Sequence, residues 1–251
     1  VNFNFYYFVL FRNIRKALSM EEVRTYFLII LTSVAILFVS LMNTMSNMWD
    51  ALRHAAFQVA SIITTTGYAS ADFDQWSQTC KTVLVILMFV GACAGSTGGG
   101  MKVSRLVIMF KTVVKELSSY FHPKNIKKIN MDGKPVEHEV VRAVNVYFIT
   151  IMGIFTLSVF LVSLEGRDLV TNFTAVASCL NNIGPGLSEV GPTRNFGGLT
   201  GFTKYVLMFD MLAGRLELFP LLLIFNPGVY RDMIMGAWRS IKRRRQERRA
   251  N

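Results

Sequence analysis

SIITTTGY, residues 61–68, and SCLNNIGPG, residues 178–186, are two glycine-bearing strips that each follow a short amphipathic segment. Those segments, Met48 to Ile63 and Leu169 to Asn181, are too short and too polar to cross a bilayer, which takes about 20 apolar residues. We therefore expect two re-entrant helices, each of which enters the membrane and leads into a glycine strip.

The strips belong to an internal repeat. Three landmarks recur in order at offsets of 118, 117 and 119 residues: Arg24 with Arg142, Gly67 with Gly184, and Ala94-Gly95 with Ala213-Gly214. A constant offset is typical of repeated structural units. It predicts two copies of one unit (span, short helix, glycine strip, span), and both copies share one orientation because each crosses the membrane twice.

The composition argues against an ordinary soluble enzyme. Hydrophobic residues make up 52% of the 251, and the mean hydropathy is +0.38. Charged residues make up 17%, against about 25% in soluble domains. Apolar runs at 23–43, 139–164 and 202–225 predict three spanning helices.

A fourth apolar segment is interrupted by glycines. TVLVILMFVGACAG, which starts at Thr82, runs into Ser96-Thr97-Gly98-Gly99-Gly100, and apolar residues resume at Val103. Three successive glycines disfavour a continuous helix. We expect two half-helices joined by a loop at membrane depth. Such a loop must line a cavity or be buried in protein, since exposed backbone is costly in lipid.

Positive charge is distributed unevenly along the chain. Most of the 27 Lys and Arg residues precede residue 25, lie between residues 102 and 142, or follow residue 230. The segments expected on the opposite side carry only Arg53, Lys81, Arg167, Arg194 and Lys204. The positive-inside rule then places both chain ends and the middle segment in the cytoplasm. We interpret the net charge of +11 as basic segments that flank the membrane spans on the cytoplasmic side. We therefore expect membrane lipid, and no nucleic acid, as a partner.

Residues that would support catalysis or metal chemistry are sparse. The three Cys lie at unrelated spacings, and His54, His122 and His138 are scattered. Neither a GxSxG nor an HExxH motif occurs. We expect no enzyme activity and no covalently bound cofactor.

The chemistry of the strips suits the passage of a cation. A cation that crosses a bilayer must exchange water for other oxygens, and main-chain carbonyls can supply them where glycine permits the required backbone. The threonine hydroxyls and asparagine amides add oxygens without a fixed charge. The preceding helix also directs its negative end at the strip. For one strip alone, an ordinary helix cap ending at glycine is the simpler interpretation, and the repetition favours an ion pathway.

Four longer motifs carry a resemblance to a known family. They are TTTGY (64–68), GACAGSTGGGMK (91–102), NNIGPGLS (181–188) and LAGRLELFP (212–220). With them the chain resembles the C-terminal half of a potassium-uptake subunit of the Trk/Ktr/HKT superfamily, closest to the TrkH/TrkG branch. The resemblance implies an all-α membrane protein with four span–pore helix–span units around one pore, of which this chain supplies the third and fourth.

The resemblance also implies a division of the chain. The expected parts are a cytoplasmic end of the preceding unit with its linker (1–22), the third pore unit (23–117), a cytoplasmic linker (118–138), the fourth pore unit (139–226) and a basic cytoplasmic tail (227–251). The first two units are missing, and two filter strands alone do not enclose an ion. We therefore expect a fragment, one piece of a split protein, or part of a larger assembly.

By the same resemblance the strips would be potassium-filter strands, with Gly67 and Gly184 as the filter glycines. The expected filter residues are Thr64, Thr65, Thr66, Gly67, Tyr68, Asn181, Asn182, Ile183, Gly184 and Pro185. The carbonyls of Thr65, Thr66, Asn182 and Ile183 would lie nearest the ion.

The resemblance further implies a gate below the filter. The expected gate residues are Arg215, Gly95, Ser96, Thr97, Gly98, Gly99, Gly100, Lys102 and Glu217. An arginine midway along a span costs about 2.5 to 3.5 kcal/mol, so Arg215 should face the pore interior, where it would repel resting cations. A structural ion pair with Asp210 or Glu217 is the alternative, although neither spacing is ideal on one helix face. Lys102 and Glu217 could pair in one state of the gate.

Function and partners follow as expectations. The chain would serve potassium uptake across the bacterial inner membrane as a multi-pass pore-forming subunit with potassium as its substrate. The family forms homodimers and works with a cytosolic nucleotide-binding ring, a TrkA-like regulator. The sequence leaves open whether flux is channel-like or a symport coupled to sodium or protons. A non-conducting half-subunit with an assembly or regulatory role is the alternative function.

Overall fold

Two long apolar helices dominate the computed structural model, which describes residues 2–96, 98–121 and 128–215. They are α3 (Glu21–Met42, 22 residues) and α7 (His138–Ser163, 26 residues), and both are long and apolar enough to cross a membrane. The third expected span begins as α9 (Gly201–Arg215), and its remaining residues lie outside the described ranges. All described elements belong to one unit, Val1–Arg215.

The two short amphipathic segments are helical. They form α4 (Met48–Ile63) and α8 (Leu169–Leu180), each begun by a side-chain cap, from Asn47 and Asp168 respectively. Their outer connections carry short 3-10 turns at Phe73–Gln75, Ser188–Val190 and Phe196–Gly198. The order α3, α4, strip, α5 therefore recurs as α7, α8, strip, α9. That these two sets form quarters of one pore stays a prediction.

The glycine-interrupted segment is broken, and the break is longer than expected. Helix α5 (Gln78–Val90) ends before the GACAG residues, and α6 (Val103–Phe121) starts after the glycine run. Gly91 ends α5 at φ 63°, where a Cβ atom would lie 2.7 Å from the carbonyl oxygen of Met101. The close return of the chain at this point explains why the helix stops at Val90.

Two regions differ in detail from the expectation. The segment before α3 folds as two short helices, α1 (Phe3–Leu10) and α2 (Ile14–Ser19), which the sequence does not predict individually; its assignment to the preceding unit stays a prediction. The middle linker contains an unpredicted hairpin of strands β1 (Asn130–Met131) and β2 (Lys134–Pro135), turned by Asp132 and Gly133 at positive φ. Residues 122–127 of that linker and the basic tail 227–251 lie outside the described ranges.

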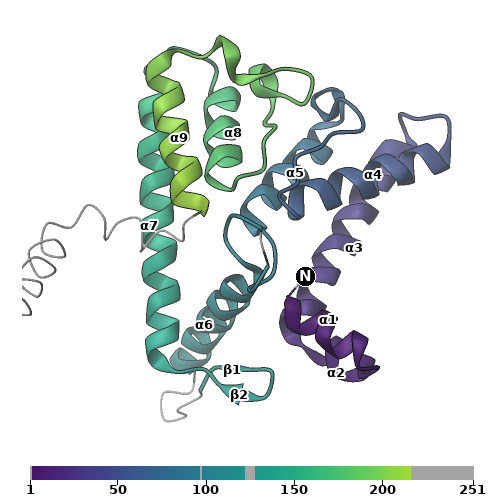
Figure 1. Cartoon of the computed structure of the whole chain (residues 1–251), viewed down its shortest axis with the longest axis vertical. Coiled ribbons are helices and arrows are strands. Elements are labelled where there is room, and N and C mark those ends of the chain that lie inside the picture. Colours follow the sequence, from purple (N-terminus) through teal and green to yellow (C-terminus); the bar gives the residue numbers. More distant parts are fainter. Residues whose placement is uncertain (1, 97, 122–127, 216–251) are drawn as a thin grey trace, which may run out of the picture. The chain divides into compact units, whose positions relative to one another are not determined.

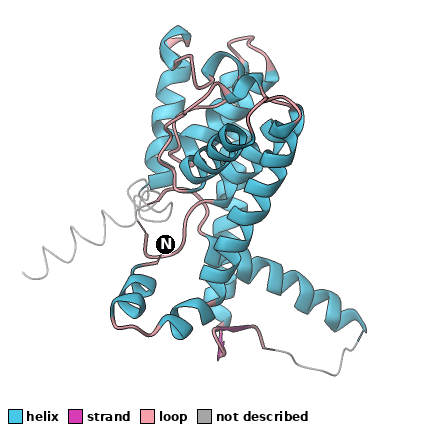
Figure 2. Ribbon diagram, turned by 90° about the vertical axis from the view of Figure 1, so that its right-hand side faces the viewer, coloured by secondary structure: helices cyan, strands magenta, loops and turns pink. Residues whose placement is uncertain are grey.

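Packing joins the two halves through α8. This helix contacts α7 and α9 of its own half and α5 of the other, while α3 packs on α4 and α5. Phe89, Phe155 and Phe173 form a cluster between α5, α7 and α8, with ring centroids 5.1 to 6.1 Å apart. Figure 2 shows the loops gathered among the helices at one end, with the strands at the other.

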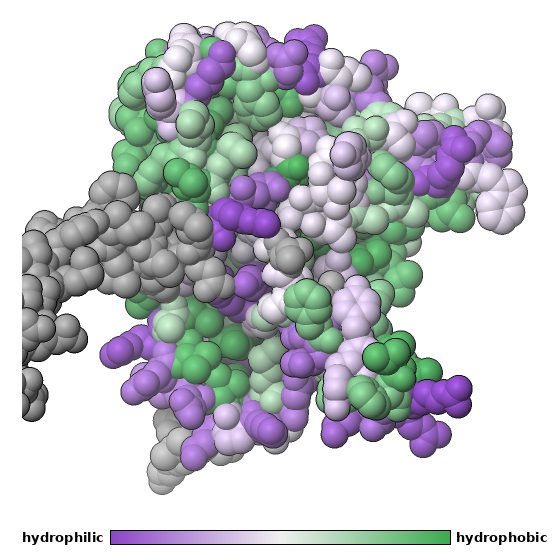
Figure 3. Space-filling model, in the orientation of Figure 1, coloured by the Kyte–Doolittle hydropathy of each residue, from purple (hydrophilic) through white to green (hydrophobic). Residues whose placement is uncertain are grey.

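The exposed side chains of α7 and α9 are largely apolar. They include Ile149, Leu157 and Phe160 on α7 and Tyr205 and Met208 on α9. Figure 3 shows this apolar surface, together with hydrophilic side chains gathered near the hairpin and α2. An apolar belt beside polar ends suits helices that face lipid.

Candidate functional site

Helix α4 ends in a Schellman motif that sets the start of the first strip. The N–H of Thr65 donates to the carbonyl of Ile62 (3.0 Å), and that of Thr66 to the carbonyl of Ser61 (2.9 Å). Thr65 occupies the left-handed position at φ 55°. Glycine usually holds this position, and a β-branched residue there is strained.

Helix α8 ends in the same way, 117 residues later. The N–H of Asn182 donates to the carbonyl of Cys179 (3.1 Å), and that of Ile183 to the carbonyl of Ser178 (2.9 Å). Asn182 is left-handed at φ 55°, like Thr65. Because Thr65 and Asn182 hold the cap positions, the glycines two residues later are not the helix caps that the simpler interpretation of a single strip assumed.

The glycines lie where the two strips meet. A Cβ atom on Gly67 would stand 1.9 Å from the carbonyl oxygen of Ile183 and 3.4 Å from Cδ of Pro185. A Cβ on Gly184 would lie 3.9 Å from the Cα of Gly67. Both glycines have positive φ, 80° and 120°. The structure therefore brings the two predicted filter strips into direct contact.

A serine in the last turn of each helix braces its strip. Ser61 Oγ donates to the carbonyl of Tyr68 (2.5 Å), and Ser178 Oγ donates to the carbonyl of Gly184 (2.7 Å). Ser178 Oγ also accepts the N–H of Gly184 (3.1 Å). Sequence reasoning gave these serines no role, although their shared offset of 117 was a signal that could have found them.

Most main-chain oxygens of the two predicted filter strands accept no hydrogen bond from the described residues. Within residues 2–96, 98–121 and 128–215, the carbonyls of Thr65, Thr66, Asn182 and Ile183 accept no hydrogen bond. Within the same residues the carbonyls of Thr64, Gly67, Asn181 and Pro185 also accept none, so this property includes the four oxygens that the sequence suggests for a cation but does not single them out. Their binding role stays a prediction.

The glycine-rich loop between α5 and α6 lies against both strips. The N–H of Gly99 donates to Thr65 Oγ1 (3.3 Å). A Cβ on Gly99 would stand 2.7 Å from the carbonyl oxygen of Asn181, and one on Gly100 2.7 Å from Oδ1 of the same residue. The loop thus touches the first strip through a hydroxyl and the second through an asparagine.

Helix α9 packs tightly against the end of α8. A Cβ on Gly214 would lie 1.7 Å from the carbonyl oxygen of Leu180, and Asn182 Nδ2 donates to the carbonyl of Met211 (3.1 Å). Arg215 follows in the last described turn with an exposed side chain. Asp210, which is fully buried, accepts a hydrogen bond from Ser158 Oγ (2.6 Å).

The remaining predicted gate residues are only partly described. Gly95 is exposed, Ser96 and Gly98 are half-buried in the loop, and Lys102 is half-buried just before α6. Thr97 and Glu217 lie outside the described ranges, so the suggested pairing of Lys102 with Glu217 does too.

A cavity opens beside the second strip. Its volume is about 670 Å³, and its lining includes Asn182, Ile183 and Gly184 from the strip, with Leu207 and Met211 from α9. One side of the strip therefore faces open space rather than packed protein.

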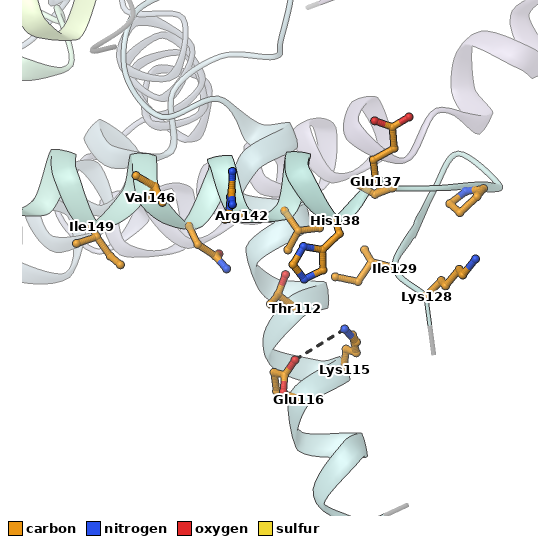
Figure 4. Close-up of a pocket in the computed structure, with 14 residues that line it drawn as sticks. Thr112, Lys115, Glu116, Lys128, Ile129, Glu137, His138, Arg142, Val146 and Ile149 are labelled. Carbon is orange, nitrogen blue, oxygen red and sulfur yellow. Dashed lines mark ion pairs between the residues drawn. The ribbon is translucent and has the colours of Figure 1, made fainter. Parts of the chain in front are cut away.

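A second cavity of about 670 Å³ lies between α6, the hairpin and the start of α7 (Figure 4). Lys115, Lys128 and Arg142 line it together with apolar residues, and Lys115 pairs with the neighbouring Glu116 at 3.9 Å. Its lining shares no residue with the strips or the glycine-rich loop.

An ionic cluster connects the loops at the C-terminal end of α7. Arg167 pairs with Glu165 (2.7 Å) and also contacts Glu189 and the carbonyl of Gly198. Burial would raise the pKa of Glu165, but hydrogen bonds from Thr203, Arg167 and Thr200 outweigh it and lower that pKa to about 2. The hydrogen bond from Thr171 likewise lowers the pKa of Asp168, the cap of α8.

The described ranges hold no group of three or more His, Cys, Asp or Glu side chains that could bind a metal ion. The three cysteines, Cys80, Cys93 and Cys179, are free and buried. The chemical groups at the site are therefore main-chain carbonyls, hydroxyls and amides, which suit a weakly held monovalent cation.

Comparison with known proteins first identifies the protein family. The profile of the TrkH family, described as a cation transport protein, matches residues 8–235. The chain belongs to the TrkH family of membrane transport proteins.

Individual relatives point the same way. The Trk system potassium uptake protein TrkH of Halomonas elongata is 37% identical over 204 residues, which are 81% of this chain and 41% of that protein. TrkG of Escherichia coli K12, also a Trk system potassium uptake protein, is 32% identical over 235 residues, 92% of this chain and 48% of its own. These relatives are transport proteins rather than enzymes.

A solved structure shares the fold. The crystal structure of the potassium transporter TrkH from Vibrio parahaemolyticus matches with a TM-score of 0.83 and 33% identity, over 92% of this chain and 50% of that one. The chain spans less than half the length of the curated relatives it matches.

Proposed function

We propose that the chain contributes half of a pore for potassium uptake across the bacterial inner membrane. The observation that carries this proposal is the direct contact of two glycine strips in which most carbonyls, including those of Thr65, Thr66, Asn182 and Ile183, accept no hydrogen bond in the described part of the chain. Such carbonyls can replace the water around a dehydrated cation. We propose potassium as the ion because the relatives are potassium uptake proteins.

The helices that precede the strips support the same function. Both α4 and α8 end at a strip, so their partly negative C-terminal ends are directed at it. Such an end favours a nearby cation by about 0.3 to 2 kcal/mol. No carboxylate stands in either strip, so the ion would be held weakly enough to leave.

The filter strands in this proposal are Thr64–Tyr68 and Asn181–Pro185. The gate is formed by Gly95–Gly100 with Lys102 and by Arg215 with Glu217. The bond from Gly99 to Thr65 and the contact of Gly214 with α8 support a gate that acts on the strips from below. Arg215 would place a positive charge near the pathway and repel resting cations.

A complete pore needs further units in addition to this chain. Two strips do not surround an ion, and the cavity beside Asn182–Gly184 is the side on which another unit would pack. We assign residues 23–117 and 139–226 as the third and fourth units of four, joined by the linker 118–138 and flanked by 1–22 and the basic tail 227–251. Both ends would be cytoplasmic.

Partners are proposed on the same basis. The complete protein would form a homodimer and respond to a cytosolic nucleotide-binding regulator of the TrkA kind. The hairpin and the basic residues of the middle linker give such a regulator a surface on the cytoplasmic side.

Co-expression tests the proposal. The chain would be produced with an N-terminal half from a TrkH relative in a bacterium that lacks potassium uptake, and growth at low potassium and Rb⁺ uptake would be measured. We expect growth that depends on both halves and is lost with Gly67→Ser. Membrane insertion of both halves without any Rb⁺ uptake would contradict a pore and favour the alternative, a non-conducting subunit with an assembly role.

A further inference from the structure

A buried carboxylate at the start of α3 joins the two ends of the glycine-rich loop. Glu22 is only 3% exposed, although it lies in the first turn of a long apolar helix. Its Oε1 accepts the N–H of Ala94 (2.6 Å) and the N–H of Ser104 (3.2 Å). Its Oε2 accepts a bond from Asn2 Nδ2 (3.5 Å).

These two N–H groups lie on either side of the loop glycines. Ala94 precedes Gly95, and Ser104 lies in the first turn of α6 just beyond the loop. A main-chain hydrogen bond also joins the two ends of the loop: the N–H of Val103 donates to the carbonyl of Ala92 (3.1 Å). Glu22 therefore connects, through one oxygen atom, the segments that enter and leave the loop.

The hydrogen bonds of Glu22 should hold the two ends of the loop firmly. A buried carboxylate is costly unless it is hydrogen-bonded, and bonds to a charged acceptor are roughly twice as strong as neutral ones. Ser104 also lies at a helix start, where the main-chain N–H groups have no intrahelical partners and favour negative charge. Among the described residues of the loop, in contrast, the hydrogen bond to the first strip is a long one, from Gly99 to Thr65 (3.3 Å).

The neighbouring residue connects the same helical turn to the cytoplasmic hairpin. The N–H of Glu21 donates to Asp132 Oδ1 in the hairpin turn (2.7 Å), and the Glu21 carboxylate pairs with Lys111 of α6. Lys111 Nζ also donates to the carbonyl of Asn130 in β1 (2.6 Å). Since the N-cap residue of α3, Met20, makes no side-chain bond, Asp132 supplies the missing cap from 111 residues away. Figure 1 shows the hairpin beside the end of α6.

We propose that the first turn of α3 is a latch for the glycine-rich loop: Glu22 holds the loop against the strips, and Glu21 transmits movement of the hairpin to that turn. This inference rests on the proposed gate. Glu22 acts as a positioning residue, because it contacts the loop backbone and not the ion. A cytosolic regulator that pulls on the hairpin would remove the Asp132 cap, shift the turn and release the loop.

The test uses the complete protein, with this half joined to the missing half, in membranes, and with Cys93 as its only cysteine. Cys93 is fully buried and stands next to Ala94, so its reaction with a methanethiosulfonate reagent reports exposure of this end of the loop whether or not ions flow. Because the Glu22 charge also acts on this thiol, the uncharged Glu22→Gln variant is the reference for Glu22→Ala. Rb⁺ flux without regulator is measured in parallel. The two readouts separate a failure of the latch from a failure of the pore.

We expect Glu22→Ala to raise the rate of Cys93 modification and the basal Rb⁺ flux about tenfold each, as loss of charge-assisted bonds predicts. Glu22→Gln keeps an oxygen acceptor at the same place and should stay within about threefold of the wild type. Asp132→Ala should raise both rates by a smaller factor, and Asp132→Asn, which still caps, should not. If Glu22→Ala does not accumulate, Glu22→Asp, whose shorter side chain weakens both bonds, makes the same comparison.

Unchanged Cys93 modification in Glu22→Ala, at normal membrane abundance, would overturn the latch. An increase in Cys93 modification without any Rb⁺ flux in the wild type or the variant would keep the latch and contradict the pore instead. Equal effects of Asp132→Ala and Asp132→Asn would remove the hairpin from the latch.

Discussion

The two strips have the same backbone conformation but different hydrogen-bond partners. In each, a Schellman motif is followed by a left-handed residue at φ 55°, a glycine at positive φ and a serine brace. The first strip accepts a hydrogen bond, at Thr65 Oγ1, from Gly99 of the glycine-rich loop. The second is bonded through Asn182 to the carbonyl of Met211 in helix α9.

For the proposed gate, this difference predicts which strip is affected when the loop moves. The loop touches both strips, but among the described residues its hydrogen bond goes to the first strip, at Thr65, while its contact with the second, at Asn181, is by packing. In the proposed gate, movement of the loop would therefore remove a hydrogen bond from the first strip. We therefore assign loop opening its main effect at Thr65, with the second strip serving as the fixed side of the pathway. The predictions that follow test, in turn, the backbone conformation that the strips have in common and the different partners that hold them.

The largest effect is expected from Gly67→Ala. The new Cβ would meet the carbonyl oxygen of Ile183 at 1.9 Å in a left-handed backbone, and overpacking with strain costs about 3 kcal/mol or more. Rb⁺ uptake by the complete protein should fall to background. Gly184→Ala, whose nearest atom is 3.9 Å away, should keep part of the uptake and lose preference for potassium over sodium.

The matched control for these variants is Gly153→Ala in α7, where a Cβ would meet nothing within 4 Å. It should transport like the wild type. Equal losses for Gly67→Ala and Gly184→Ala would show that the contact between the strips is not what requires glycine.

The next largest effect is expected from Arg215→Ala. Removal of a positive charge near the pathway lowers the barrier to cations, so basal Rb⁺ flux should rise about tenfold. Arg215→Lys keeps the charge and should raise the flux less. Deletion within Ser96–Gly100 should increase flux in the same direction, and normal basal flux in both the alanine variant and the deletion would refute a gate made of these parts.

A smaller effect is expected at Thr65. Thr65→Ala removes the acceptor for the Gly99 N–H, a loss of about 1 kcal/mol, and should raise basal flux about fivefold. Thr65→Ser keeps the hydroxyl and relieves the strain of a β-branched residue at φ 55°, so it should match the wild type. Asn182→Ala, which loses its bond to α9 instead, should lower uptake rather than raise basal flux.

The smallest effect concerns the outer ionic cluster and pH. Because the folded-state pKa of Glu165 is lowered to about 2, its contribution to stability is present above the unfolded-state pKa of about 4.3 and is lost as the pH falls toward 2. Glu165→Gln should therefore lose on the order of 1 kcal/mol at pH 7 and depend less on pH below 5. Thermal unfolding of the purified complete protein between pH 3 and pH 7 measures both. A variant as pH-sensitive as the wild type would contradict the assignment.

Much of this arrangement can be predicted from local sequence. The bounds of α4 and α8, the break near the glycine run and the placing of Gly67 and Gly184 follow from segment length, glycine content and the constant offset. These features depend on residues within a few turns of one another. The family resemblance adds the expected roles, which stay predictions for each residue.

The remainder depends on contacts between distant segments. The glycine at position 67 is required by the carbonyl of Ile183, 116 residues away, and no local rule shows this contact. Glu22 reads as a helix-start acid, yet its partners lie 72 and 82 residues away. Asp132 lies in the hairpin turn and also caps α3, 111 residues away in the sequence. Packing between segments, rather than local preference, determines these roles.

A structure of the complete protein in Rb⁺, with the ion located by its anomalous scattering, tests the ion pathway most directly. We predict an Rb⁺ peak at coordination distance from the carbonyl oxygens of Thr65, Thr66, Asn182 and Ile183. A peak only elsewhere, with these four oxygens turned away or bonded to protein, would contradict the role of the strips.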